Sequence, residues 1–183
     1  MTTRVFILFL IFSNLSNAQL AFEDVATQVG VNYSYGDSEY GGGVSFADFN
    51  NDGWDDITYA TEDGAQIYFF ENNNGVFNLV TLNGISNTYK TKQVIWIDYD
   101  NDGDFDIYAT NISRIDDGET QPRHNILLRN DWSLNNTLSF VEISENSGIN
   151  VGASGWDWGT TFFDSNNDGY VDLASTNGWP QIN

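Results

Sequence analysis

Short apolar segments alternate with polar turns along most of the chain. The segments GVSFA, ITYAT, QIYFF and VFNLV are each rich in Val, Phe, Ile, Tyr or Thr, and Gly, Asn and Asp separate them. Runs of this length and composition are typical of β-strands. No segment after residue 18 shows the 3.6-residue apolar period of an amphipathic helix. The pattern therefore predicts an all-β fold built from short strands.

The first eighteen residues follow a different pattern. MTTR carries one positive charge, VFILFLIF is an apolar run of eight residues, and Ser16-Asn17-Ala18 closes the segment. A short basic start, an apolar run and a small-x-small ending are typical of a secretory signal peptide. The apolar run is too short to cross a membrane as a helix. We therefore predict a signal peptide over 1–18 and a secreted protein without membrane insertion, the alternative being a buried N-terminal strand.

A nine-residue polar motif occurs three times between predicted strands. Its copies are DFNNDGWDD (48–56), DYDNDGDFD (98–106) and DSNNDGYVD (164–172), and all fit D-x-[DN]-N-D-G-x-x-D. The first aspartates lie 50 and then 66 residues apart, and an insertion over 111–124 accounts for much of the difference. An internal repeat of this kind indicates one supersecondary unit used several times.

A second, Phe-led segment also repeats. FEDVATQVGV, FNLVTLNGI and FVEISENSGI each open with Phe and close with Gly and an aliphatic residue, and we expect each to form a strand. They divide the repeat region, 19–183, into units of about 19–76, 77–139 and 140–183, the last incomplete. Four strands per unit of about 40–50 residues is typical of a propeller blade, with a solenoid as the competing architecture.

The number of units predicts a partial β-propeller of about two and a half four-stranded blades. A propeller needs about four to eight blades to close. We therefore expect the remaining blades either to be missing, because the chain is a fragment of a longer protein, or to be supplied by self-assembly with further copies.

The charge balance limits the classes of partner that this chain is expected to bind. Residues 19–183 hold 26 acids and 5 bases, a formal charge of −21, and no cysteine. A nucleic-acid partner is not expected, because phosphate binding needs clustered Lys and Arg. No disulfide can stabilise the fold outside the cell. The acids themselves therefore become the candidates for stabilising chemistry.

The nine-residue motif has the oxygen donors that calcium prefers. Calcium takes six to eight oxygen ligands, and a glycine in the loop allows the chain to turn around the ion. We expect side chains at positions 1, 3, 5 and 9 and the carbonyl at position 7 to bind about three Ca²⁺ ions. The expected ligands are Asp48, Asn50, Asp52, Trp54 (carbonyl) and Asp56; Asp98, Asp100, Asp102, Asp104 (carbonyl) and Asp106; and Asp164, Asn166, Asp168, Tyr170 (carbonyl) and Asp172.

Three alternatives fit the motif less well than a calcium loop of this kind: an EF-hand, a simple solvated turn and a magnesium site. An EF-hand needs Glu at position 12, where this chain has Tyr59, Ala109 and Ser175, and it needs flanking helices. Simple solvated hairpin turns do not require acids at positions 1, 5 and 9 in three copies. Magnesium favours a strict octahedron with retained waters. The second loop, with four ligand carboxylates against three in the others, is expected to bind calcium most tightly.

The three loops and their flanking strands resemble FG-GAP/VCBS repeats, the calcium-loop blades of integrin-alpha-type propellers. GWDWGTTFFDSNNDGYVDLASTNG and the Phe-led segments are similar to the secreted subfamily of cartilage acidic proteins and ASPIC/UnbV-type proteins. This resemblance covers nearly all of 19–183 and implies a seven-bladed propeller with a calcium loop in many blades.

Signals for catalysis are weak, and we do not expect an enzyme. The sequence has no cysteine, no H-E-x-x-H and no G-x-S-x-G motif, and its single histidine, His124, lies in a polar loop with no evident partner. The expected function is an extracellular recognition or cell adhesion scaffold for a protein or polysaccharide. The alternative is the non-catalytic propeller portion of a larger secreted carbohydrate-active enzyme. Three tryptophans near the third loop are more consistent with packing between blades than with a sugar-binding platform: Trp156, Trp158 and Trp179. The 111–124 insertion is equally consistent with a recognition loop and with a tolerated insertion.

Overall fold

The computed structural model describes residues 21–36, 42–112, 124–132, 137–149 and 157–177. The predicted signal peptide (1–18), Trp156, Trp179 and most of the 111–124 insertion lie outside these ranges. Among the described residues, no helix is long and apolar enough to cross a membrane.

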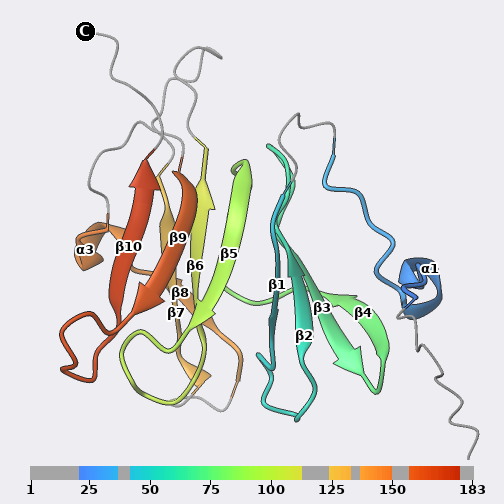
Figure 1. The fold of residues 1–183 in the computed structure, drawn as a ribbon, viewed down its shortest axis with the longest axis horizontal. Coiled ribbons are helices and arrows are strands. Elements are labelled where there is room, and N and C mark those ends of the chain that lie inside the picture. Colours follow the sequence, from blue (N-terminus) through green and yellow to red (C-terminus); the bar gives the residue numbers. More distant parts are fainter. Residues whose placement is uncertain (1–20, 37–41, 113–123, 133–136, 150–156, 178–183) are drawn as a thin grey trace, which may run out of the picture.

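Within the described residues, ten strands form three antiparallel sheets (Figure 1). The first sheet has the order β1-β2-β3-β4, the second β5-β6-β7-β8, and the third consists of β9 and β10. This arrangement confirms the all-β, partial-propeller prediction. The bounds are β1 (Val44–Ala47), β2 (Asp56–Tyr59), β3 (Tyr68–Asn73), β4 (Val76–Val80), β5 (Thr91–Ile97), β6 (Asp106–Asn111), β7 (Ile126–Asn130), β8 (Phe140–Glu142), β9 (Asp157–Phe163) and β10 (Asp172–Asn177).

Local turn chemistry explains the order of strands within a sheet. Asn74 and Gly75 connect β3 to β4, and both have positive φ, 55° and 89°. Two such residues form the tight hairpin turn whose twist matches that of paired strands. Neighbouring strands in each sheet are also neighbours in sequence, so each sheet is an up-and-down meander.

The first strands of neighbouring sheets lie close together. The N–H of Gly43, just before β1, donates to the carbonyl of Lys92 in β5 at 2.8 Å. In β5, Oε1 of Gln93 accepts from the N–H of Thr160 in β9 at 3.2 Å. β1, β5 and β9 therefore adjoin in series, as the inner strands of propeller blades do.

Aromatic rings fill the space between the first two sheets. Trp96 of β5 stacks on Phe49 with ring centroids 5.2 Å apart, and the edges of Phe69 and Phe140 meet Trp96. The indole N–H of Trp96 donates to Oγ1 of Thr58 at 3.0 Å, so its polar atom is also satisfied. Large rings therefore pack between neighbouring sheets here. The packing predicted for Trp156 and Trp179 lies outside the described residues.

The Phe-led segments differ from one another. Phe77 lies in β4 and Phe140 begins β8, so two of the three form strands as expected. The expected strand at the first copy is wrong: Phe22 is 99% exposed, and the chain forms a one-turn helix, α1 (Ala26–Val29), whose first N–H is accepted by Asp24. A second one-turn helix, α3 (Ser144–Ser147), follows β8. Single turns are too short to show an apolar period, which is why the sequence pattern did not reveal them.

The backbone conformation explains why glycine occurs at the end of each Phe-led segment. Gly30, Gly84 and Gly148 have φ of 93°, 85° and 79°. A Cβ on Gly30 would lie 2.5 Å from the Phe77 carbonyl oxygen, and one on Gly84 would lie 1.8 Å from that of Phe140. The end of one Phe-led segment therefore packs on the start of the next. The unit boundaries that these segments suggested stay a prediction.

Candidate metal centre

The three nine-residue loops lie at the same end of their sheets (Figure 1). Loop 1 (48–56) joins β1 to β2, loop 2 (98–106) joins β5 to β6, and loop 3 (164–172) joins β9 to β10. Each loop therefore connects the first two strands of its sheet, so the same positions recur in the same structural setting.

The aspartate at position 1 organises each loop. In loop 1, the two carboxylate oxygens of Asp48 accept from the N–H groups of Asp52 and Gly53 at 2.9 and 2.8 Å. Asp98 makes the same pair of contacts in loop 2, both at 3.1 Å, and Asp164 makes them in loop 3 at 3.1 and 2.9 Å. The repeated carboxylate thus holds the tip of its own turn.

Backbone geometry at positions 4 and 6 is also shared. The glycines at position 6 have φ between 88° and 93°. Asn51, Asn101 and Asn167 at position 4 have φ of 56°, 62° and 61°, a left-handed conformation that asparagine tolerates better than most residues. The role of position 4 was missed from the sequence, although the Asn in all three copies was a usable signal.

The aspartate at position 9 links its loop to the third strand of the sheet. Asp106 is fully buried, and its Oδ1 accepts from the N–H of Asn130 in β7 at 2.7 Å while Oδ2 accepts from Tyr99 at 3.1 Å. Asp56 is likewise buried and accepts from Asn72 in β3 at 2.7 Å and from Phe49 at 3.1 Å.

The asparagines on the third strands complete these contacts. The amide of Asn72 donates to the carbonyl of Asp55 at 2.8 Å, and that of Asn130 donates to the carbonyl of Phe105 at 3.1 Å. Sequence analysis did not identify either asparagine. The signal was the shared ending of the segments YFFEN and ILLRN, which place Asn at the same point of the strand.

Burial raises the pKa of two of the three position-9 carboxyls, those of Asp56 and Asp106. Desolvation raises the pKa of Asp106 to about 7 and that of Asp56 to about 6, against the lowering effect of the backbone N–H groups that they accept from. Burial also raises the pKa of Asp100. In loop 3 the hydroxyl and N–H of Ser165 lower the pKa of Asp172, which is only partly buried. A cation beside the buried groups would favour their charged forms.

Loop 2 gathers the most acidic set of donors. Oxygens of Asp98, Asp100 and Asp106 all lie within 4.8 Å of one another, and this is the one such group among the residues that the structure describes. Loops 1 and 3 carry Asn at position 3. Asn50 and Asn166 instead pair with the aspartate at position 5, donating to Asp52 and Asp168 at 3.0 and 2.9 Å. Three ligand clusters were expected, one in each loop. Only in loop 2, among the described residues, do three carboxylates lie this close together.

Positions 5 and 7 form a local turn in all three loops. The N–H groups of Trp54, Asp104 and Tyr170 donate to Oδ1 of Asp52, Asp102 and Asp168, at 2.9, 3.2 and 2.9 Å. The role of the position-7 carbonyls stays a prediction.

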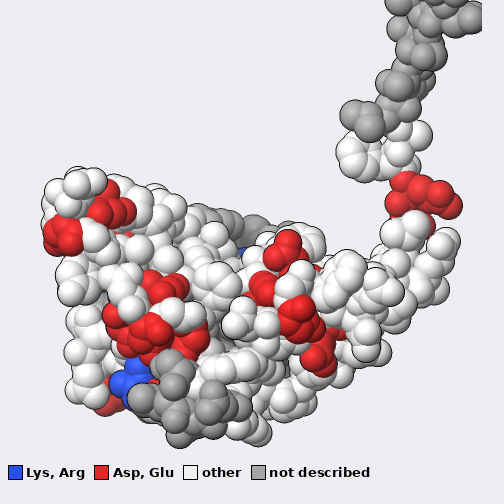
Figure 2. All heavy atoms as spheres, turned by 90° about the horizontal axis from the view of Figure 1, so that it is seen from below, with Lys and Arg blue, Asp and Glu red and all other residues white. Residues whose placement is uncertain are grey.

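The loops also contact one another. The amide of Asn101 in loop 2 donates to the carbonyl of Gly169 in loop 3 at 2.9 Å. A cavity of about 130 Å³ between loops 1 and 2 is lined by Asp48, Asp102 and Trp132, among others. Figure 2, which views this end of the molecule, shows Asp and Glu side chains gathered in separate groups across the face. The loops thus place several separate acidic groups on one face of the molecule.

The comparison with known families supports this repeat. Residues 48–109 match the model of the FG-GAP-like repeat, from the first aspartate of loop 1 into β6 beyond loop 2. These residues are therefore similar to FG-GAP-like repeats. Cartilage acidic protein 1 of Xenopus tropicalis is 35% identical over 95 residues, which cover 50% of this chain and 14% of that protein. This chain therefore matches a small part of that relative's length. No solved structure matches this chain.

The oxygen donors of the three loops fit calcium. Ligand oxygens lie 2.3–2.6 Å from Ca²⁺, so two ligands of one ion are at most about 5 Å apart. The three carboxylates of loop 2 satisfy this limit. All candidate ligands are oxygens, as a hard cation requires. Loop 2 could therefore hold the ion with Asp98, Asp100 and Asp106, with Asp102 beside them.

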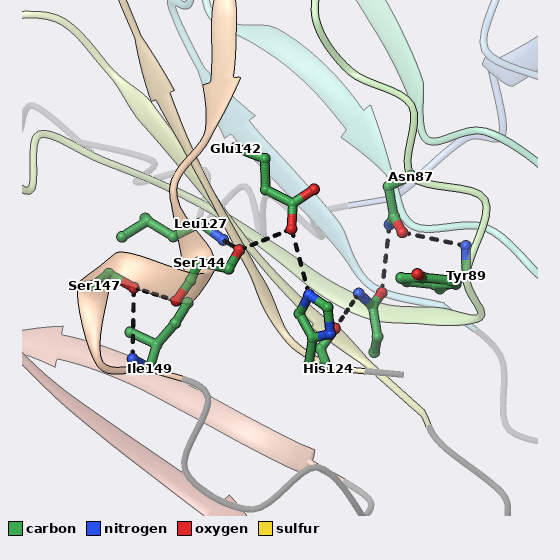
Figure 3. Close-up of polar contacts among 9 residues, drawn as sticks. Asn87, Tyr89, His124, Leu127, Glu142, Ser144, Ser147 and Ile149 are labelled. Carbon is green, nitrogen blue, oxygen red and sulfur yellow. Dashed lines mark hydrogen bonds and ion pairs between the residues drawn. The ribbon is translucent and has the colours of Figure 1, made fainter. Parts of the chain in front are cut away.

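A separate polar cluster joins His124, just before β7, to Glu142 of β8 and Ser144 of α3 (Figure 3). Nε2 of His124 lies 3.3 Å from Oε1 of Glu142, which also accepts from the hydroxyl of Ser144 at 3.1 Å. This partner of His124 was not evident from the sequence, because Glu142 is 18 residues away and is brought near by β7–β8 pairing. Ser144 is buried and also accepts from the N–H of Leu127, so the cluster ties α3 to β7.

Proposed function

We propose that this chain is a calcium-binding propeller repeat protein that acts outside the cell as a recognition or adhesion scaffold. The observation that carries the calcium assignment is the convergence of Asp98, Asp100 and Asp106 within 4.8 Å of one another in loop 2. Loops 1 and 3 share the position-1 hydrogen bonds of loop 2 and its positive φ at positions 4 and 6. This similarity supports a calcium site in each loop, about three ions in all.

The ion would act on structure. Each loop holds several carboxylates that repel one another when charged, and desolvation adds a further cost for buried Asp56 and Asp106. A bound divalent cation removes both penalties in the folded state. Since position 9 also holds the third strand, calcium binding would stabilise the sheet as a whole.

The acidic end is the proposed recognition surface. The loops that form it sit on rigid sheets, which is the usual setting for binding residues. Trp54 and Tyr170, at position 7 of loops 1 and 3, are 47% and 62% exposed there. Exposed aromatic rings beside bound cations suit contact with a protein or a polysaccharide. Secretion through the segment 1–18 would place this surface outside the cell.

We propose no catalytic role for the described part of the chain. In the cluster of Figure 3, Glu142 lies between Ser144 and His124, whereas an activated serine requires direct contact with the histidine. The buried Ser144 hydroxyl also holds α3 in place. This cluster therefore fits a structural role.

Calorimetric titration of calcium into the metal-free protein tests the proposal. We expect about three binding events in the full chain, and the loss of one of them in Asp100→Ala. Glu145→Ala, which removes an exposed acid outside the loops, is the matched control and should leave all binding events unchanged. An absence of calcium binding, or an equal effect of both substitutions, would refute the assignment.

A further inference from the structure

The third strand of each four-stranded sheet carries a charged residue close to its nine-residue loop. Glu71 of β3 and Arg129 of β7 each come directly before the asparagine that holds the last residue of the loop. The two charged residues therefore occupy the same place in two similar sheets. Their charges are opposite, and this difference accompanies a difference between the loops at position 3.

Glu71 contacts position 3 of loop 1. Its Oε1 accepts from Nδ2 of Asn50 at 2.9 Å, and the same nitrogen donates to Oδ2 of Asp52 at 3.0 Å. The other end of the amide, Oδ1 of Asn50, accepts from the N–H of Asp52 at 3.1 Å. Because only the amide nitrogen can donate to a carboxylate, Glu71 and Asp52 together fix the orientation of the Asn50 amide.

The orientation of this amide matters for a cation. Asparagine binds calcium through its carbonyl oxygen, whereas its amide nitrogen only donates hydrogen bonds. If the amide turned over, its N–H groups would point to the place expected for a ligand oxygen. The contact with Glu71, which comes from a different strand, opposes this rotation. It also adds a carboxylate beside a loop that has three candidate ligand carboxylates.

Position 3 of loop 2 is an acid, and the charge on the third strand is reversed. Asp100 takes the place of asparagine, and Arg129 takes the place of glutamate. Burial raises the pKa of Asp100 and the Arg129 guanidinium acts in the opposite direction, so the two side chains attract one another. Nε of Arg129 also pairs with Oδ1 of Asp131 at 2.8 Å, which restrains the guanidinium. A glutamate in place of Arg129 would add a carboxylate beside the loop that already has four.

We propose that Glu71 is a positioning residue for calcium in loop 1, and that the third-strand charge is matched to position 3: glutamate with asparagine, arginine with aspartate. Glu71 holds the Asn50 amide so that the remaining lone pair of Oδ1 is available to the ion. Arg129 offsets the extra negative charge that Asp100 brings to loop 2. This inference rests on the proposed calcium function. Neither residue is a ligand, so the order of affinities expected from the ligand carboxylates stays the same.

Substitutions in loop 1 of the full chain test the match. Glu71→Arg should weaken calcium binding in loop 1 about 10–100-fold, the usual range for residues that hold a metal ligand, because arginine cannot accept from the Asn50 amide. When Asn50→Asp is added, most of the lost affinity should return, because the new pair is the one found in loop 2. Titration against a competing chelator measures the affinity. The NMR signal of the Gly53 N–H, in loop 1, distinguishes this site from the other two.

The same variants have a readout that does not need calcium. In chelator, Asn50→Asp should lower the free energy of unfolding, because it places a carboxylate against Glu71, and the addition of Glu71→Arg should recover the loss. Arg129→Glu should lower it in the same way, by placing like charge beside Asp100. Glu145→Arg, which makes the same change of charge as Glu71→Arg at an exposed residue outside the loops, is the matched control. It should leave loop 1 unchanged and should not recover the loss.

A further pair of variants tests the hydrogen bond and does not depend on the folding of Glu71→Arg. Glu71→Gln keeps an oxygen that can accept from the Asn50 amide, whereas Glu71→Leu has no acceptor. Glu71→Gln should therefore retain more loop 1 affinity than Glu71→Leu. Equal losses in the two variants would overturn the positioning role.

The combined variant decides whether charge and position 3 are matched. Additive effects of Asn50→Asp and Glu71→Arg, on affinity and on stability, would overturn the match, because Glu71 would then act independently of position 3. If the unsubstituted protein binds no calcium, the proposed function fails and this inference fails with it. If it binds calcium and the effects are additive, the inference alone fails.

Discussion

The N–H of Asn130 donates to Oδ1 of Asp106 at 2.7 Å across 24 residues of sequence. The same contact joins Asn72 and Asp56, 16 residues apart. In both sheets the last residue of the nine-residue loop thus holds the third strand, so the loop and the sheet are expected to unfold together.

The first prediction concerns this contact. Asp106→Asn should destabilise the metal-free protein by about 1–3 kcal/mol, because an amide nitrogen cannot accept and one of the N–H groups of Asn130 and Tyr99 is left buried without its acceptor. Urea unfolding measures the loss. Asp172→Asn, at the same loop position but partly exposed, is the control and should cost less. Equal losses would contradict the role of the third-strand contact.

Calcium removal is the second test. If calcium binds the folded state alone, each site contributes about 2.7 kcal/mol when calcium is a hundredfold above its Kd. The Tm should therefore rise with calcium concentration and fall when a chelator is added. Differential scanning calorimetry provides the measurement. A Tm that does not change between chelator and excess calcium would contradict the structural role of the ion.

The third prediction ranks the sites. Loop 2 has four candidate ligand carboxylates and the other loops three, so loop 2 should bind calcium most tightly. Asp100→Asn gives loop 2 the donor set of loops 1 and 3 and should reduce its affinity to theirs. Calorimetric titration of both proteins checks the order, and a weakest site in loop 2 would disprove it.

Acidity should oppose calcium binding. The pKa of Asp106 is raised by burial from 3.8 to about 7, so the metal-free folded state holds a proton there that the unfolded state releases above about pH 4. The free energy of unfolding in chelator should therefore fall as pH rises from 4 to 7. Calcium must displace this proton, so its affinity should fall below pH 7. Asp106→Asn should flatten the stability profile in chelator, and an unchanged profile would count against the raised pKa.

The fifth prediction compares two glycines with similar φ. Gly84→Ala places a Cβ 1.8 Å from the Phe140 carbonyl oxygen, whereas a Cβ on Gly75 meets nothing within 4 Å. Gly75→Ala should cost about 1–2 kcal/mol for the left-handed backbone alone. Gly84→Ala should cost clearly more, because β8 must also move. Thermal unfolding compares the two, and similar losses would show that the contact with Phe140 is unimportant.

Local patterns made much of this molecule predictable. The strands on each side of the loops, the loops themselves and the Asn74-Gly75 turn all follow from residues close together in sequence. The candidate ligand positions in the loops were predicted from the D-x-[DN]-N-D-G-x-x-D spacing, and loop 2 shows three of those carboxylates converging.

Contacts between distant residues were the ones that sequence did not reveal. Asn72 and Asn130 act on loops that end 16 and 24 residues earlier, and His124 meets Glu142 only because β7 and β8 pair. The first Phe-led segment was misassigned for a related reason. Phe77 and Phe140 lie in strands that pair with a neighbouring strand. Near Phe22, Oδ1 of Asp24 instead accepts the N–H of Ala26, the first residue of α1.

The connections from β2 to β3 and from β6 to β7 leave their sheets at the rim opposite loops 1 and 2 (Figure 1). The first spans 60–67 and the second 112–125, yet the two sheets to which they belong keep the same strand order. One rim can therefore gain or lose length while the charged rim stays fixed in geometry. Such a division would let the contacts at this rim vary while the loops proposed to hold calcium at the other rim keep their geometry.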